Sequence, residues 1–220
     1  MAPLLTEPNP WWPLYGLRIR TPRLELRLPE GELLSELAQV AADGLHEPDR
    51  MPFTVPWTDG SPADRGRATY QNVLSTIANW SPDNWHLSLA VLHEGKAVGR
   101  QDLMGRRFAV TREVETGSWV GLAHQGRGIG TEMRAAVLHL AFAGLGARAA
   151  VSAAMADNPR SLGVSRRLGY RDDGLTTTVV RERPATLRRL RLDRAEWERV
   201  RTVEVRVTGL APCRAEFGTP

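Results

Sequence analysis

Apolar and polar residues follow each other in a pattern that predicts strands and helices in mixed order. Residues 24–28 alternate leucine with charged residues, as a half-buried strand does, and residues 30–40 place apolar side chains at helical spacing. Prolines and a glycine in residues 43–61 predict a loop. The Ser-Pro step at 61–62 provides an N-cap and a first helical position, so a second helix is expected from there to about Asn79.

The second half of the chain predicts further strands around two more helices. A turn with the sequence His-Glu-Gly-Lys at residues 93–96 separates two apolar runs and predicts a β-hairpin. Together these elements predict one mixed α/β domain with a largely antiparallel sheet and about four helices. The expected strands are residues 86–92, 97–104, 113–120, 149–154, 170–180 and 185–192, and the expected helices are residues 131–142 and 158–168.

Residues 125–131, with the sequence Gln-Gly-Arg-Gly-Ile-Gly-Thr, join a predicted strand to a predicted helix. Three glycines at a helix N-terminus free backbone N–H groups to bind one anion, so a phosphate or pyrophosphate is the expected ligand. A dinucleotide-binding loop would need glycine at Thr131, and a Walker A loop would need a lysine that this loop lacks. Arg127 either contacts the anion or points to solvent, and a glycine-rich turn without a ligand remains the alternative.

The Gln-x-x-Gly-x-Gly pattern of this loop resembles the pyrophosphate loop of the GCN5-related N-acetyltransferases (GNAT), which binds the diphosphate of coenzyme A. Other patterns, in the correct order, resemble the RimJ/RimL-like branch of that family, although Ser118 stands where the branch usually has tyrosine. They are Thr-x-Arg-Leu-x-Leu-Arg at residues 21–27, Glu-Thr-Gly-Ser-Trp at 115–119, Asn-Pro-Arg-Ser at 158–161 with Leu-Gly-Tyr at 168–170, and Glu-Trp at 196–197.

The resemblance covers residues 17–200, which leaves an extended N-terminal arm at residues 1–16 and a C-terminal extension at residues 201–220. It implies a GNAT-like domain whose sheet is splayed at the strand before the glycine-rich loop. It also implies an N-acyltransferase that uses acetyl-CoA, or another acyl-CoA such as succinyl-CoA, as cosubstrate. Valine alternates with charged residues over 202–208, which predicts either an edge strand or pairing with a second subunit as a homodimer.

The coenzyme contacts implied by the resemblance are mostly main-chain contacts. The backbone of Trp119 and Val120 would receive the pantetheine arm, and the Val120 amide would stabilise the carbonyl oxygen of the thioester. Asn158 would hydrogen-bond the pantetheine amide, or it would only cap its own helix. The diphosphate would rest on the loop residues Gln125, Gly126, Arg127, Gly128, Ile129, Gly130 and Thr131.

Two side chains are candidates for proton transfer. Glu115 shares a strand face with Trp119, and burial in a half-dry cleft would suit it as the general base. Its alternative is a surface carboxylate paired with Arg112. Ser161 would donate a proton to the departing thiolate, or it would hydrogen-bond only to its own helix backbone.

Trp57 is expected in the wall of the acceptor site, with core packing as the alternative. The acceptor would be a primary amine, on a protein N-terminus, a lysine or a small molecule. Arg50 or Arg65 could pair with the free carboxylate of a succinyl group, which keeps that donor open. A non-catalytic acyl-CoA-binding module is the competing function.

Composition narrows these options further. The net charge of the 220 residues is +4, carried by arginines that are interleaved with acids, so neither a nucleic-acid nor a membrane partner is expected. The chain contains no apolar run of transmembrane length and no secretory pattern, and a cytoplasmic location is expected. Cys213 is the single cysteine, and the five histidines lack metal-ligand spacing, so neither an intramolecular disulfide nor a metal site is predicted.

Overall fold

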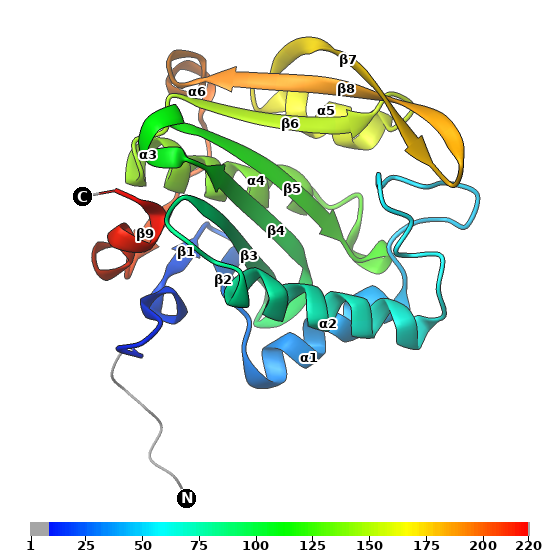
Figure 1. The fold of residues 1–220 in the computed structure, drawn as a ribbon, viewed down its shortest axis with the longest axis horizontal. Helices are drawn as coiled ribbons and strands as arrows, with labels where there is room; N and C mark the ends of the chain where they lie inside the picture. Colours follow the sequence, from blue (N-terminus) through cyan, green and yellow to red (C-terminus); the bar gives the residue numbers. More distant parts are fainter. Residues whose placement is uncertain (1–8, 220) are drawn as a thin grey trace, which may run out of the picture.

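A computed structural model describes residues 9–219, and their strands form one open sheet in the order β7-β8-β6-β5-β4-β3-β2-β1-β9 (Figure 1). Every neighbouring pair in that order is antiparallel except β5 and β6. The predicted mixed α/β domain with a mostly antiparallel sheet is therefore confirmed. The strands are β1 (Arg18–Arg20), β2 (Leu24–Arg27), β3 (Asn84–His93), β4 (Lys96–Arg106), β5 (Glu113–Val120), β6 (Ala149–Met155), β7 (Arg171–Val180), β8 (Arg183–Asp193) and β9 (Arg206–Thr208).

The parallel pair β5 and β6 is joined only at its start. Cα partners are Glu113 with Ala149, Val114 with Ala150, and Glu115 with Val151, and beyond this point the two strands part. The sheet is thus splayed along the second half of β5, as predicted, and the gap leads towards the loop that follows β5.

Helices cover both faces of this sheet. The four predicted helices are present, and the short helices α3 and α6 were not predicted because each is only four to seven residues long. A π-helical turn, η3 (Leu140–Gly144), continues α4. The α-helices are α1 (Gly31–Asp43), α2 (Pro62–Ala78), α3 (Phe108–Thr111), α4 (Ile129–His139), α5 (Pro159–Arg167) and α6 (Arg194–Val200), and the short 3-10 helices are η1 (Pro13–Gly16), η2 (Leu122–His124) and η4 (Ala211–Phe217).

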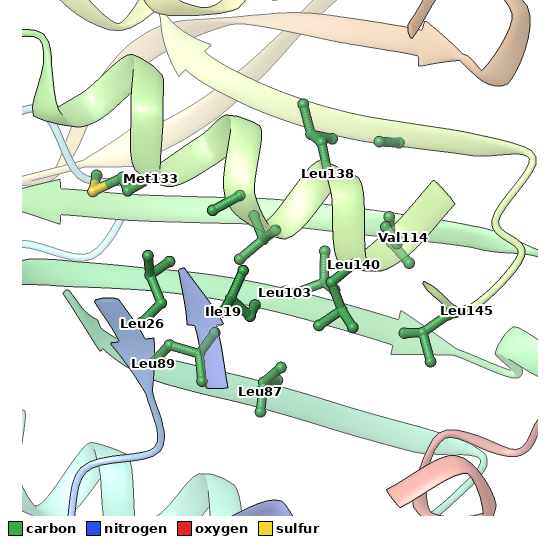
Figure 2. Packing of buried hydrophobic residues seen from close by; sticks show 14 of the residues in the cluster. Ile19, Leu26, Leu87, Leu89, Leu103, Val114, Met133, Leu138, Leu140 and Leu145 are labelled. Atoms are coloured by element: carbon green, nitrogen blue, oxygen red, sulfur yellow. The ribbon is translucent and has the colours of Figure 1, made fainter. Parts of the chain in front are cut away.

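The core has two parts, one on each face of the sheet. In the larger part, α4 and η3 pack onto the sheet, and Figure 2 shows Leu140 beside Leu103 of β4, with Met133 and Leu138 in the same cluster. In the smaller part, α1 and α2 pack on the opposite face, where Trp119 of β5 is buried. Alternate residues of β5 therefore face different helices, and Glu115 lies on the same face as Trp119.

The start of α2 follows the predicted signal closely. The hydroxyl of Ser61 accepts a hydrogen bond from the Asp64 N–H at 3.2 Å, and the Asp64 carboxylate accepts one from the Ser61 N–H at 3.1 Å. This capping box, with Pro62 in the first position, fixes where the helix begins. The loop before it lies beside the tip of the β7–β8 hairpin (Figure 1), where Arg181 Nε donates to Asp59 at 2.8 Å.

Both ends of the described chain lie against the β1 edge of the sheet. Strand β9 of the C-terminal extension pairs with β1, so the valine alternation does supply an edge strand, although only three residues long. Phe217 packs edge-to-face against Trp80 and Trp85. Residues 9–16 form a turn and the helix η1 instead of an extended segment, and the remainder of the predicted arm, residues 1–8, lies outside the described residues.

Candidate active site

The glycine loop (residues 125–131) keeps its backbone donors unused. Gly126 and Gly128 have φ angles of 77° and 78°, a left-handed conformation that glycine adopts without strain, and Gly128 is the N-cap of α4. The N–H groups of residues 126–130 donate to no described residue, whereas the Thr131 N–H already donates to the Gly128 carbonyl at 3.1 Å. Free donors at a helix N-terminus form a site for a phosphate group.

Gln125 anchors this loop through its side chain. Its Nε2 donates to the Val120 carbonyl at 2.9 Å and to the Leu45 carbonyl at 2.7 Å, which ties the loop to the end of β5 and to the end of α1. Its Oε1 accepts from Arg160 at 2.8 Å. The Gln125 side chain is therefore occupied within the protein, and its effect on a phosphate would come through loop shape. Arg160 and the exposed Arg127 add positive charge beside the loop.

The Thr-x-Arg pattern at residues 21–23 also supports the loop. Thr21 Oγ1 donates to Glu132 at 2.6 Å, Arg23 Nε donates to the same carboxylate at 2.7 Å, and Arg23 Nη1 donates to the Arg127 carbonyl at 3.1 Å. Burial opposes ionisation of Glu132, but these donors outweigh it and hold the pKa of Glu132 below its usual value. The turn between β1 and β2 thus fixes the orientation of the first turn of α4.

The gap between β5 and β6 presents main-chain groups of β5. The Gly121 N–H donates to the Val98 carbonyl of β4 at 2.9 Å. Because ladder hydrogen bonds alternate along an antiparallel pair, the N–H groups of Val120 and Ser118 face the gap instead of β4. The Trp119 side chain lies on the α1 face, where its ring centre is 6.5 Å from that of Trp57. Trp119 is buried in the smaller core and Trp57 packs against it. This is the core packing that was the alternative to a place in the acceptor site.

Helix α5 begins beside the gap with Asn158 as its N-cap. The Asn158 Oδ1 accepts from the Ser161 N–H at 3.1 Å, so capping occupies this oxygen and leaves its amide donors for a ligand. The half-buried Ser161 has a hydroxyl with no hydrogen-bond partner among residues 9–219. Asn158 therefore caps its own helix, which was one of its two predicted roles. The Asn158 amide group and the Ser161 hydroxyl both keep hydrogen-bond donors that a coenzyme could use.

A buried guanidinium lies between α4, α5 and β5. Arg134 donates to Ser165 Oγ at 2.9 Å and to Ser118 Oγ at 3.2 Å, and burial lowers its pKa. The serine that replaces the usual tyrosine at 118 thus joins β5 to α4. Tyr170 is buried with its hydroxyl 3.2 Å from Thr116 Oγ1, and burial raises the pKa of Tyr170. Tyr170 of the Leu-Gly-Tyr motif therefore packs in the core.

Glu115 lines a cavity of about 470 Å³ on the α2 face of the sheet. Its side chain is exposed, so the half-dry cleft expected around it is not present in the free protein. Trp57 does not line this cavity. The lining comes instead from helices α2 and α3 and from strands β3, β4, β5 and β6: Asn72, Ser75, Thr76, Asn79, Asn84, Trp85, His86, Met104, Arg106, Thr111, Glu113, Val114, Glu115 and Val151.

Beside this cavity lies a polar cluster that the sequence interpretation missed. His86 Nε2 is 3.1 Å from Asp102 Oδ1, Arg100 Nε donates to the same oxygen at 2.8 Å, and Arg100 Nη1 donates to Asn72 at 2.6 Å. Burial opposes ionisation of Asp102, but the charge of Arg100 and the hydrogen bond with His86 outweigh it, and the pKa of Asp102 lies below its usual value. The hairpin register contained the signal, because it pairs Ser88 with Asp102 and so places His86 diagonally opposite.

A comparison with protein-family models agrees with this geometry. The model of the acetyltransferase (GNAT) domain matches residues 23–171, more than half of the chain. The chain belongs to the acetyltransferase (GNAT) family. Members of this family transfer an acyl group from coenzyme A, which confirms the predicted acyl-CoA-dependent N-acyltransferase at the level of the family.

Solved GNAT structures share the fold. The RimJ of Mycobacterium smegmatis, in complex with CoA-disulfide, has a TM-score of 0.68 at 16% identity, over 92% of this chain and 95% of that chain. A putative ribosomal-protein-serine acetyltransferase from Vibrio cholerae has a TM-score of 0.62 at 19% identity, over 80% and 97%. A GCN5-related N-acetyltransferase from Brucella melitensis has a TM-score of 0.63 at 23% identity, over 82% and 80%.

Other predicted features of this GNAT protein have the following positions. The Arg65 guanidinium donates to the Ala42 carbonyl at 2.7 Å and so caps the end of α1, while Arg50 is exposed.

Cys213 is buried, and burial raises the pKa of its thiol to about 11. Among residues 9–219 no group of three or more His, Cys, Asp or Glu side chains could hold a metal ion, and no helix there has the length and apolar character needed to cross a bilayer.

Proposed function

We propose that this protein transfers an acetyl group from acetyl-CoA directly to a primary amine. The observation that carries the proposal is the course of β5. Near its start this strand places Glu115 in the cavity, it then runs beside the gap, and after the short helix η2 the chain enters the glycine loop with its free N–H donors. A coenzyme whose diphosphate rests on the loop and whose arm follows the gap would bring its thioester to the cavity, where an amine can attack it.

In this arrangement the diphosphate is bound by the unused N–H groups of residues 126–130, and the Gln125 side chain fixes the shape of the loop. The Val120 N–H, which faces the gap, donates to the thioester oxygen as negative charge develops on it. The free amide donors of Asn158 bind the pantetheine arm, and Ser161 donates a proton to the departing thiolate. Glu115 accepts a proton from the amine nitrogen, directly or through a water molecule.

The first cavity is assigned to the acceptor because Glu115 lines it. A second cavity, of about 740 Å³, lies where the β7–β8 hairpin meets the α1–α2 loop, and Glu115 is not among its lining residues. The acceptor classes remain a protein N-terminus, a lysine side chain or a small amine. Because Arg65 is occupied as a helix cap, only Arg50 of the two predicted arginines is left for a succinyl carboxylate, and acetyl-CoA is the preferred donor.

Release of free thiol tests this function. The full chain would be incubated with acetyl-CoA or succinyl-CoA and a panel of peptides with free N-termini, lysine peptides and small amines. We expect amine-dependent thiol release that is faster with acetyl-CoA. Binding of acetyl-CoA without thiol release for any amine would favour the non-catalytic module, and faster release with succinyl-CoA would assign the other donor.

Replacing Glu115 by glutamine is expected to lower kcat about a hundredfold with little change in the Kd for acetyl-CoA. The substitution keeps the size of the side chain and removes its ability to accept a proton, while the coenzyme contacts lie elsewhere. Steady-state kinetics and calorimetry measure the two quantities. Glu94→Gln, at the tip of the β3–β4 hairpin, is the control, and an unchanged kcat for Glu115→Gln would remove Glu115 from the mechanism.

A further inference from the structure

The imidazole of His86 lies between a buried carboxylate and the acceptor cavity. Its Nε2 is 3.1 Å from Asp102 Oδ1, and its Nδ1 has no hydrogen-bond partner among residues 9–219. The His86 side chain is 31% exposed, whereas that of Asp102 is 12% exposed, so the ring separates Asp102 from the cavity that His86 lines.

The partner of Nε2 determines which ring nitrogen carries the proton. Asp102 is held in its charged form by Arg100, and a carboxylate can only accept hydrogen bonds, so Nε2 is the protonated nitrogen of the neutral ring. Arg100 Nη2 is 3.5 Å from Nε2, too far to compete with the 3.1 Å contact. Nδ1 therefore keeps its lone pair, as a general base requires.

His86 and Glu115 occupy one row across the sheet. The strand registers pair His86 with Met104 and Met104 with Glu115. Directly paired residues of neighbouring strands point to the same face, so all three point to the α2 side. Two strand spacings separate the two outer residues, about 10 Å. Both outer residues line the same cavity, so a primary amine that enters it lies between an imidazole and a carboxylate.

We propose that His86, positioned by Asp102, is a second proton acceptor in the acceptor cavity and removes the first proton from the acceptor ammonium. This inference rests on the proposed function, because it assigns a step of the same transfer. A primary ammonium must lose one proton to become a nucleophile, and its nitrogen loses another when the amide forms.

The two acceptors suit different steps. A free imidazole titrates near pH 6.5 and a free carboxyl near pH 4.3, so an imidazole is the better base for an ammonium, whose pKa is about 8 to 10. After the amine attacks the thioester carbonyl, its nitrogen carries a positive charge next to the new C–N bond and is far more acidic. The Glu115 carboxylate suffices to accept that second proton.

The protons then balance. The C–N bond forms and the C–S bond breaks. The departing thiolate takes up one proton from the Ser161 hydroxyl. Water then returns a proton to Ser161, and this is the proton that Glu115 accepted from the amine nitrogen. The proton on His86 passes to solvent. One ammonium and one acyl-CoA thus yield one amide, one free thiol and one released proton.

The charged surroundings of His86 come from two strands. Strand β4 contributes Arg100, Asp102 and Arg106, and β5 contributes Glu113 and Glu115, of which Glu113 is paired with Arg191 of β8 at 2.6 Å. Helix α2 contributes only uncharged side chains to the cavity wall: Asn72, Ser75, Thr76 and Asn79. Among these groups, His86 is the one that offers a free nitrogen lone pair.

His86→Gln tests the proposal, because the glutamine amide can still reach Asp102 but cannot accept a proton. We expect kcat at pH 7 to fall about a hundredfold with an unchanged Kd for acetyl-CoA. We also expect the rate of the variant to rise with pH in proportion to the neutral fraction of the amine. His93→Gln, at the far end of β3, is the matched control and is expected to behave as wild type.

Rescue by a diffusible base separates a chemical role from a structural one. In His86→Ala, added imidazole is expected to restore kcat at least tenfold in a concentration-dependent manner, and it should have no effect on wild type or on His93→Ala. If wild type is active, either of two results would overturn the proposal. One is an unchanged kcat for His86→Gln, and the other is a folded His86→Ala that added imidazole does not rescue. Absence of thiol release by wild type would instead contradict the proposed function.

Discussion

Replacing Gly128 by valine is expected to raise the Kd for acetyl-CoA roughly a thousandfold. Gly128 has a φ angle of 78° and serves as the N-cap of α4. A β-branched residue is strongly disfavoured there, so the backbone must leave the left-handed region and rotate the neighbouring peptide groups. A Cβ at this position would also lie 3.3 Å from the Arg23 guanidinium that ties the loop to β2.

The size of this effect follows from the number of donors lost. Hydrogen bonds to charged groups contribute about 1.5 to 3 kcal/mol each, and displacement of two N–H groups removes about 3 to 6 kcal/mol from binding. The Gln125 side chain is occupied with the backbone of β5, and the substitution at Gly128 leaves the charge of Arg127 unchanged. Main-chain geometry at Gly128 is therefore the property that the substitution tests.

Gly95→Val is the matched control. Gly95 has the same φ of 78°, at the tip of the β3–β4 hairpin, and a Cβ there meets no atom within 4 Å. Both variants should lose stability from backbone strain, but only Gly128→Val should lose coenzyme affinity. Isothermal titration calorimetry with acetyl-CoA and thermal melts of both variants measure the two effects. Equal affinities would show that the loop does not bind the diphosphate.

The regular elements and the glycine loop could be predicted from sequence because local rules determine them. The capping box at Ser61, the hairpin turn at residues 93–96 and the glycine loop each depend on a few consecutive residues. The short helix α6 lacks the length that gives a clear period, and the edge strand β9 was one of two open alternatives.

The roles of individual polar side chains were harder to predict, because each depends on a distant backbone group. Gln125 was expected on the coenzyme, and in the fold its side chain bonds to the carbonyls of Leu45 and Val120 and to the Arg160 guanidinium. Arg65 was considered for an acyl carboxylate and caps α1 instead. The sequence gives the residue types at such positions, whereas the helix ends and strand ends that they satisfy come together only in the fold.

His86 shows a different limit. Five scattered histidines were set aside because none had metal-ligand spacing, yet spacing along the chain has no bearing on a contact across a hairpin. The predicted hairpin would have placed His86 near Asp102, if its register had been used to pair the side chains on one face. Arg100, which contacts Asp102, also donates to Asn72 of α2, and sequence pattern alone does not place that helix against the strand.

Replacing Asp102 by leucine is expected to lower the free energy of unfolding by about 3 to 5 kcal/mol, because it leaves the buried Arg100 without its counter-charge. Arg100 and Asp102 are 7% and 8% exposed, so water cannot replace the lost carboxylate. Replacing the whole ion pair is less costly than breaking it, and the double variant Arg100→Met with Asp102→Leu is expected to regain most of the loss. Urea unfolding of wild type and both variants measures this difference. Asp172→Leu, which removes the partner of the exposed Arg188, is the control and should change stability little.

The dependence of the unfolding free energy on pH in the acid range gives an independent measure of the charge state of Asp102. The pKa of Asp102 is lower in the folded protein than the value of about 3.9 for an unfolded chain, so the folded state binds fewer protons at Asp102 as the pH falls. The stabilisation linked to ionised Asp102 is complete above the unfolded pKa and is lost as the pH falls through the folded pKa. Other carboxyls with lowered pKa, such as Glu132 and Asp193, contribute equally in wild type and in the double variant. Below about pH 4 the free energy of unfolding of wild type should therefore fall more steeply than that of the double variant. A difference between the two free energies that does not depend on pH would mean that Asp102 is not held in its charged form.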